Sequence, residues 1–142
     1  MPAPVPAAAL SAALSAQEPG APAADGDLLG RLARAVAGSA APDRGALRTA
    51  VRALALELAA RAPGRTVEVR VPPYAAVQCV EGPRHTRGTP PNVVEAEPLA
   101  FVRLCTGALS WEDAVADGRL RASGERAGAV AALLPRVSRS TT

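Results

Sequence analysis

The chain has 142 residues and a mass of 14.3 kDa, which leaves room for one domain. Its 16 basic residues and 13 acidic residues are interleaved along the chain and give a formal net charge of +3. Because binding to a phosphate backbone needs a concentrated basic face, nucleic acid is not an expected partner. No stretch approaches the roughly 18 uninterrupted apolar residues of a membrane span, so integral membrane contact is not expected either. The composition is typical of a soluble globular domain and indicates no function by itself.

The N-terminus lacks the cationic start of a secretory signal peptide, since the first basic residue is Arg31. We therefore expect a cytoplasmic protein. Cys79 and Cys105 are too few for a disulfide framework, and together with the single histidine they do not have the spacing of a metal-binding set. The sequence thus predicts neither a metal nor a cofactor.

Residues 1–24 are rich in Ala and Pro and carry Glu18 as their only charge. Small side chains bury too little area to offset the ordering of the backbone, so we expect a disordered tail. The alternative is a transient helix over Ala7–Ala16. The ordered domain is expected over 25–137, followed by a frayed end at 138–142.

Two helices are expected to open the domain. The first begins after the acids of residues 25–27, carries leucines and a valine at helical spacing, and ends at Gly38. The second begins at Pro42-Asp43 and closes at Arg61 and Gly64. Its apolar face consists of Leu47, Val51, Leu54 and Leu58.

Arg44, Arg48 and Arg52 recur every four residues on the other face of this second helix. We interpret these three arginines mainly as the solvated face of the helix. The alternative is that these arginines contact an acidic partner or, transiently, an acidic membrane surface.

Three strands follow in the middle of the chain. Residues 66–71 read TVEVRV and alternate apolar with polar side chains, which predicts a strand with its valines on the core side and with Glu68 and Arg70 outward. A Pro-Pro pair interrupts the chain there. Further strands are predicted at 74–80 and 93–96.

The C-terminal part returns to helical periodicity with one short strand. Pro98 and Gly107 mark the two ends of one helix, and Ser110 is expected to cap the next. The elements are a helix over 98–107, a helix over 110–118, a strand over 120–122 and a helix over 127–134. This order of elements predicts an α+β domain with helices packed on one face of a sheet.

The stretch from Thr66 to Leu134 resembles the sterol carrier protein family, in particular its small bacterial orthologue group. The segments that carry the resemblance are VEVRVPPYAAVQCVEGPRHTRGTPPNVVEAEP (67–98), LAFVRLCTG (99–107), WEDAVADGRLRASGERA (111–127) and a terminal pair of leucines (133–134). The resemblance implies a mixed five-stranded sheet covered by helices, with an apolar cavity for lipids between sheet and helices. It does not imply sterol specificity, because this chain has few large apolar residues with which to hold a rigid four-ring ligand.

Residues 81–92 read EGPRHTRGTPPN and contain no apolar side chain other than proline. Connections of this length in a small domain are usually functional or disordered. Arg84 and Arg87 flank His85, and two guanidinium groups can bind a lipid head group or an acyl carboxylate. The alternative is a structural strap in which these arginines pair with acids, namely Glu81, Glu95 or Glu97.

Seven residues are candidates for the wall of the apolar cavity that the resemblance implies: Val77, Cys79, Phe101, Leu104, Leu109, Trp111 and Leu133. The same side chains could instead pack in a filled core. The sequence does not distinguish a cavity wall from a close-packed core. The two cysteines are expected to be inert core residues.

The function predicted from the sequence is non-catalytic binding of a hydrophobic acyl, isoprenoid or lipid ligand. One alternative is an accessory protein-interaction domain with a filled core. Another is an enzyme or enzyme partner that uses the loop of Arg84, His85 and Arg87 on a small anion. No catalytic residue is assigned, because no nucleophile or orienting carboxylate stands in a recognisable pattern with the histidine.

Overall fold

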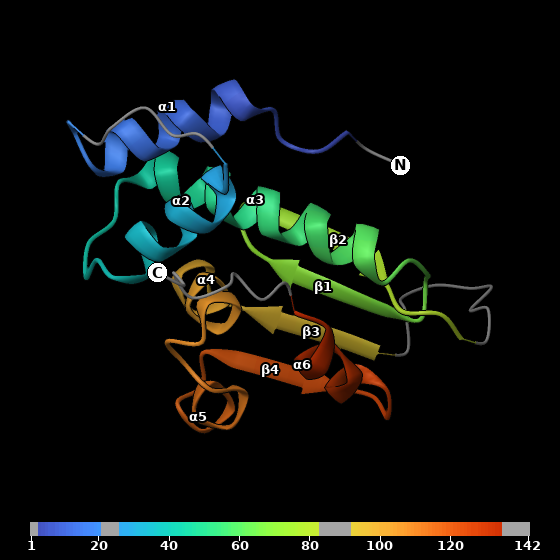
Figure 1. Ribbon diagram of the computed structural model, residues 1–142. Helices are drawn as coiled ribbons and strands as arrows, with labels where there is room; N and C mark the ends of the chain where they lie inside the picture. The colour runs from blue at the N-terminus through green and yellow to red at the C-terminus, as the bar shows by residue number, and fades with distance from the viewer. Residues whose placement is uncertain (1–2, 21–25, 83–91, 135–142) are drawn as a thin grey trace.

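The computed structural model describes residues 3–20, 26–82 and 92–134 of the chain (Figure 1). The elements in chain order are α1 (Ala7–Gln17), α2 (Leu28–Ala37), α3 (Arg44–Arg61), β1 (Val67–Val71), β2 (Ala75–Cys79), β3 (Asn92–Ala96), α4 (Pro98–Thr106), α5 (Trp111–Ala116), β4 (Leu120–Ser123), the 3₁₀ helix η1 (Ala127–Ala129) and α6 (Val130–Leu133). None of the helices in these ranges is long and apolar enough to cross a membrane.

Three helices begin at side chains that accept hydrogen bonds from free backbone N–H groups. Asp27, Asp43 and Ser110 each accept from the N–H three residues later, at 2.9, 2.9 and 3.1 Å, and so cap α2, α3 and α5. Helix α4 begins with a proline and ends at Gly107, whose φ of 79° lies in the left-handed region that glycine adopts readily. The predicted helix ends are therefore confirmed at these positions.

The four strands form one mixed sheet in the order β2-β1-β3-β4. β1 pairs antiparallel with β2 and parallel with β3, and β3 pairs antiparallel with β4. Val69 at the middle of β1 lies opposite Val77 of β2 and Val94 of β3. The α+β class with a mixed sheet is confirmed.

The alternation in β1 separates a covered face of the sheet from an open one. The three valines of β1 are buried, whereas Glu68 and Arg70 are half-buried on the other face and form an ion pair. On that face Arg70 stands opposite Glu95, and Glu95 opposite Arg121. In Figure 1, α3 lies in front of β2, and α6 lies in front of β3 and β4. The helices therefore cover the valine face, as the alternation predicts.

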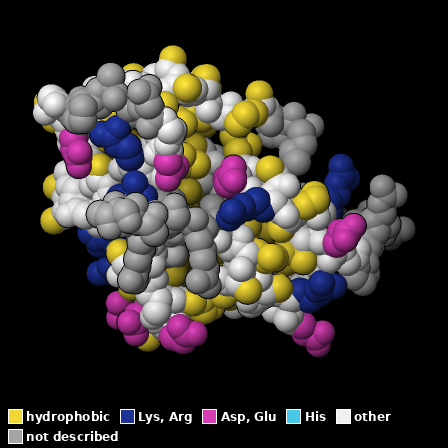
Figure 2. Space-filling view, in the orientation of Figure 1, with side chains coloured by type: hydrophobic (Ala, Val, Ile, Leu, Met, Phe, Trp, Pro, Cys, Tyr) yellow, Lys and Arg dark blue, Asp and Glu magenta, His cyan; other side chains and the backbone are white. Residues whose placement is uncertain are grey.

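The core between sheet and helices is filled with small and medium-sized side chains. Phe101 is 1% exposed and is the largest fully buried residue, with Leu32, Leu54 and Leu58 next. The rest of the core is mainly Ala and Val, which suits the low aromatic content of the chain. Figure 2 shows that acidic and basic side chains are interspersed on the molecular face seen in Figure 1, so no broad basic surface forms there.

The N-terminal segment differs from the expected disordered tail. Residues 7–17 form helix α1, which packs against α2 and α3. Leu14 is 3% exposed, Ala13 is buried beside it, and Leu10 packs against the same cluster. The side-chain oxygen of Gln17 also accepts the N–H of Asp43 at 2.8 Å. The sequence allowed a transient helix over Ala7–Ala16 as the alternative. Its composition does not predict a stably packed helix, because short helices are stabilised mainly by tertiary contacts.

We expect Leu14→Ala to lower the free energy of unfolding by about 2 kcal/mol or more, because it removes a buried leucine side chain. Ser15→Ala, on the exposed side of the same helix, is the control and should change stability by less than about 0.5 kcal/mol. Urea denaturation measures both. Equal stability of the two variants would mean that α1 is not packed on the domain.

Val69→Asp should cost several kcal/mol of stability, because Val69 is 1% exposed and the carboxylate would have no partner in the core. Arg70→Gln removes only a partly exposed ion pair and should cost no more than about 1 kcal/mol. Chemical denaturation monitored by circular dichroism compares the two variants. Similar losses at both positions would contradict the register of β1.

Candidate functional site

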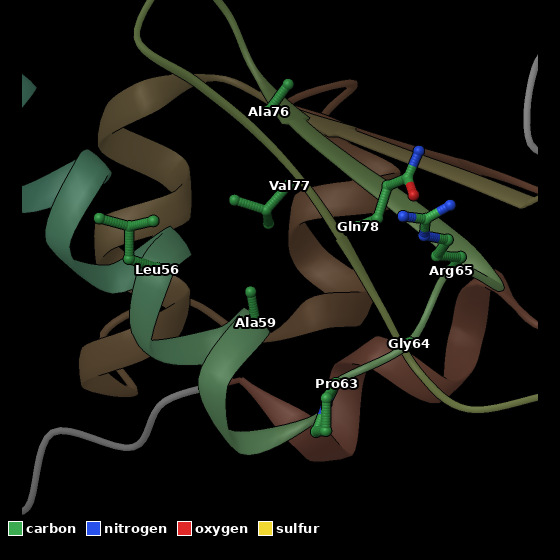
Figure 3. Close-up of a pocket in the computed structure, with 8 residues that line it drawn as sticks. All are labelled: Leu56, Ala59, Pro63, Gly64, Arg65, Ala76, Val77 and Gln78. Carbon is green, nitrogen blue, oxygen red and sulfur yellow. The ribbon is translucent and has the colours of Figure 1, made fainter. Parts of the chain in front are cut away.

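A groove of about 490 Å³ lies between the C-terminal half of α3 and the edge strand β2. Figure 3 shows the side chains that line it. They come from α3, from the connection between α3 and β1, and from β2: Leu56, Ala59, Pro63, Gly64, Arg65, Ala76, Val77 and Gln78. A volume of this size falls within the usual range for small-molecule sites, about 300–1,000 Å³.

The groove exists because α3 ends close to the free edge of the sheet. Helix α3 ends at Arg61, and the carbonyl oxygen of Ala62 accepts the N–H of Val80 at 2.8 Å. The carbonyl oxygen of Val80 in turn accepts the N–H of Thr66 at 3.1 Å. These bonds hold the end of the helix, the start of β1 and the end of β2 together, and so fix one end of the groove.

Gly64 allows this close approach. A Cβ atom added at Gly64 would lie 2.0 Å from the carbonyl oxygen of Val80, and the glycine has a φ of 151°. Only a residue without a side chain fits there without moving the backbone. The sequence places Gly64 at the end of a helix, and in the folded chain the same residue also shapes the groove.

The groove has an apolar part and a polar end (Figure 3). Ala59 points toward Val77, with Leu56 on the same helix, and these three side chains make the apolar part. At the other end the groove is lined by Arg65 and Gln78, which bring a guanidinium and an amide group. Among the ion pairs of the described residues, none involves Arg65. The arrangement can hold an apolar chain and offer hydrogen bonds to a polar group at one end.

Of the seven candidate cavity residues, Val77 lines this groove. The other six belong to the hydrophobic core or pack against it, and none of them lines the groove. Cys79, Phe101 and Leu104 are at most 9% exposed. The partly buried residues that pack against the core include Leu109, Trp111 and Leu133. Ligand contact by these six side chains stays a prediction.

The three loop residues Arg84, His85 and Arg87 lie outside the described residues, and their role as an anion site also stays a prediction. The positions on either side of 83–91 are well anchored. The side chain of Asn92 donates to the carbonyl oxygen of Thr66 at 3.0 Å and accepts the N–H of Arg126 at 2.9 Å. The guanidinium of Arg126 donates to the carbonyl oxygen of Glu81 at 3.1 Å.

Leu56, Ala59, Arg65 and Gln78 were not singled out in the sequence. Leu56 carries a signal that could have found it, because it is a leucine outside the apolar face formed by Leu47, Val51, Leu54 and Leu58. An apolar side chain outside the buried face indicates a second contact for the helix. The other residues carry no such signal, since the helix end and the edge strand meet only in the folded chain.

Neither cysteine is suited to act as a nucleophile. Burial raises the pKa of the Cys79 thiol from 9.0 to about 11 and raises that of Cys105 further. Both are free thiols. Within the described ranges, no three His, Cys, Asp or Glu side chains cluster closely enough to hold a metal ion.

One comparison with known families gives a match. The model of the family described as "bacterial SCP ortholog" matches residues 43–136, which is more than half of the chain. This segment begins at the cap of α3 and includes the whole groove. No curated protein gives a significant match.

We expect both thiols to resist a disulfide reagent such as DTNB in the native protein at pH 8, because at that pH the buried thiols stay protonated and shielded. Denaturation in guanidinium chloride should release two reactive thiols per chain. Absorbance at 412 nm follows the reaction. A fast reaction of one thiol in the native state would contradict the burial of that cysteine.

Proposed function

The chain belongs to the bacterial SCP ortholog family, a branch of the sterol carrier proteins, and from that premise we propose that it carries a hydrophobic ligand in the groove between α3 and β2. The family supports a lipid-carrier type of function. The observation that carries the proposal is the groove itself, with about 490 Å³ of space and the apolar side chains of Leu56, Ala59 and Val77 along it.

The lining of the groove supports a ligand with an apolar tail and a polar head. An acyl or isoprenoid chain fits the apolar part. Arg65 can pair with a carboxylate or phosphate, and Gln78 can donate a hydrogen bond beside it. The groove is partly open to solvent, so a chain can enter it without unfolding of the domain.

Binding without chemical conversion is the proposed activity. Among the described residues that line the groove there is no carboxylate, imidazole or thiol, so none of them can act as a general base or nucleophile. An enzyme that uses His85 would need a partner for that histidine other than these lining residues.

The second candidate is an interaction domain that binds no small ligand. The observation that favours it is the burial of Cys79, Phe101 and Leu104, which are at most 9% exposed and belong to the hydrophobic core. Native mass spectrometry of the purified protein separates the two candidates. A co-purified lipid supports the carrier, and a bare chain together with failure to bind added lipid supports the interaction domain.

Ala59→Trp should weaken binding of a fluorescent long-chain acyl probe by about tenfold or more, because the indole would fill the apolar part of the groove. Ala60→Trp is the matched control, since Ala60 is the next residue on the same helix, is exposed and does not line the groove. Fluorescence titration gives the two dissociation constants, and a tenfold change corresponds to about 1.4 kcal/mol. Unchanged affinity in Ala59→Trp would place the ligand elsewhere.

A further inference from the structure

The groove runs along the edge of β2. Three consecutive residues of this strand line it, namely Ala76, Val77 and Gln78. Successive side chains of a strand point to opposite faces of the sheet, and Figure 3 shows Val77 on the side of α3 and Ala76 on the other side. A groove that touches side chains of both faces must pass around the edge between them. The backbone of β2 is therefore part of the groove wall.

The hydrogen bonds to β1 indicate which backbone groups of β2 point away from β1. In an antiparallel pair, opposite residues exchange backbone hydrogen bonds at every second position. Thr66 continues the register of β1 with β2 and donates its N–H to the carbonyl oxygen of Val80 at 3.1 Å. Along this register, Gln78 and Ala76 are the next residues whose backbone groups face β1. The N–H and the carbonyl oxygen of Val77 thus point to the outer edge, where the described residues provide no further strand.

The outer edge of β2 lacks the features that protect an edge strand from pairing with another chain, which are usually charged side chains or proline. β2 has the sequence AAVQC, without charge or proline. The opposite edge of the sheet is β4, where Arg121 is exposed and Arg119 directly precedes the strand. A second copy of the chain would bring like charges together at β4 but not at β2.

We propose that the chain forms a dimer in which the β2 strands of two copies pair antiparallel, with Val77 opposite Val77 of the second copy. In this register the outward N–H and carbonyl oxygen of Val77 bond to the same two groups of the second copy. Two residues along, Ala75 lies opposite Cys79 of the second copy, where outward backbone groups meet again. Because the same surface serves on both copies, the contact has a two-fold axis and the assembly closes at two chains.

The groove provides the space that this pairing needs. Directly opposite residues of an antiparallel pair point to the same face, so Val77 of the second copy enters the groove beside Leu56 and Ala59. A valine side chain is small compared with the volume of the groove, about 490 Å³. Burial of these apolar side chains stabilises the dimer, because backbone hydrogen bonds largely replace bonds to water. The inference is independent of the carrier function, since it concerns the chain without a ligand.

The first test is sedimentation equilibrium of the full, lipid-free chain over a range of protein concentrations. We expect a monomer–dimer equilibrium without larger species. Val77→Arg should weaken the dimer by about tenfold or more, because two guanidinium groups would face each other at the two-fold axis. Val115→Arg is the matched control and should leave the dimer unchanged, since Val115 is 45% exposed on α5, which contacts β4 at the opposite edge of the sheet. Circular dichroism verifies that both variants fold.

A cysteine cross-link tests the register without introducing a charge. Val77→Cys places two thiols opposite each other at the axis, with about 5.5 Å between the Cα atoms, a distance that a disulfide can bridge. Ala76→Cys is the control in the same strand, because Ala76 is exposed but its two copies lie diagonally, about 7–8 Å apart. After mild oxidation, we expect non-reducing electrophoresis to show a covalent dimer of Val77→Cys and little of Ala76→Cys.

A chain that stays monomeric at every concentration would overturn the proposal. So would a dimer that Val77→Arg leaves intact or that Val115→Arg disrupts, and so would equal cross-linking at positions 76 and 77. Titration with the acyl probe tests the carrier function separately. A chain that dimerises and binds no probe removes the carrier function alone, whereas a monomeric chain that binds the probe removes the dimer alone.

Discussion

The junction at which α3, β1 and β2 meet sets the geometry on which the rest of the molecule depends. Two backbone hydrogen bonds hold Ala62, Val80 and Thr66 together, and Gly64 passes so close to Val80 that no side chain fits between them. Because the helix ends at this point, its last turns are held against the edge strand of the sheet. The distance between Leu56 or Ala59 on the helix and Val77 on the strand follows from that constraint.

The small side chains of the core are consistent with a groove that lies at the edge of the sheet, between α3 and β2, rather than inside the core. The buried core consists mainly of Ala and Val side chains, with Phe101 and a few leucines as the largest. A close-packed interior leaves little room for a ligand. At the free edge of β2 no further strand is present among the described residues, so helix and strand enclose a groove instead of a packed layer. The site proposed for the ligand therefore lies beside the core.

The charged residues of the open sheet face and those of α3 are arranged differently. On the open face of the sheet, Arg70, Glu95 and Arg121 stand opposite one another across the strands, and Glu68 pairs with Arg70, so this face is close to neutral. On α3, Arg44, Arg48 and Arg52 follow one another without an acid between them. The first arrangement stabilises an exposed sheet face and keeps it soluble. The second places three positive charges on one helix, although the net charge of the whole chain is only +3.

The sequence by itself determined the α+β class, the alternation of β1 and the approximate starts of α2, α3 and α5, because these depend on periodicity and on interactions between residues a few positions apart. It also determined the resemblance of the segment from Thr66 to Leu134, which the family match confirms. Only the tertiary structure decided that α1 packs on α2 and α3, since Leu14 gains its stability from residues distant in the chain. The groove also depends on the tertiary structure, because Ala59, Arg65 and Val77 share no pattern in the sequence. They become neighbours when the end of α3 is bonded to the end of β2, and such a contact is a property of the folded backbone.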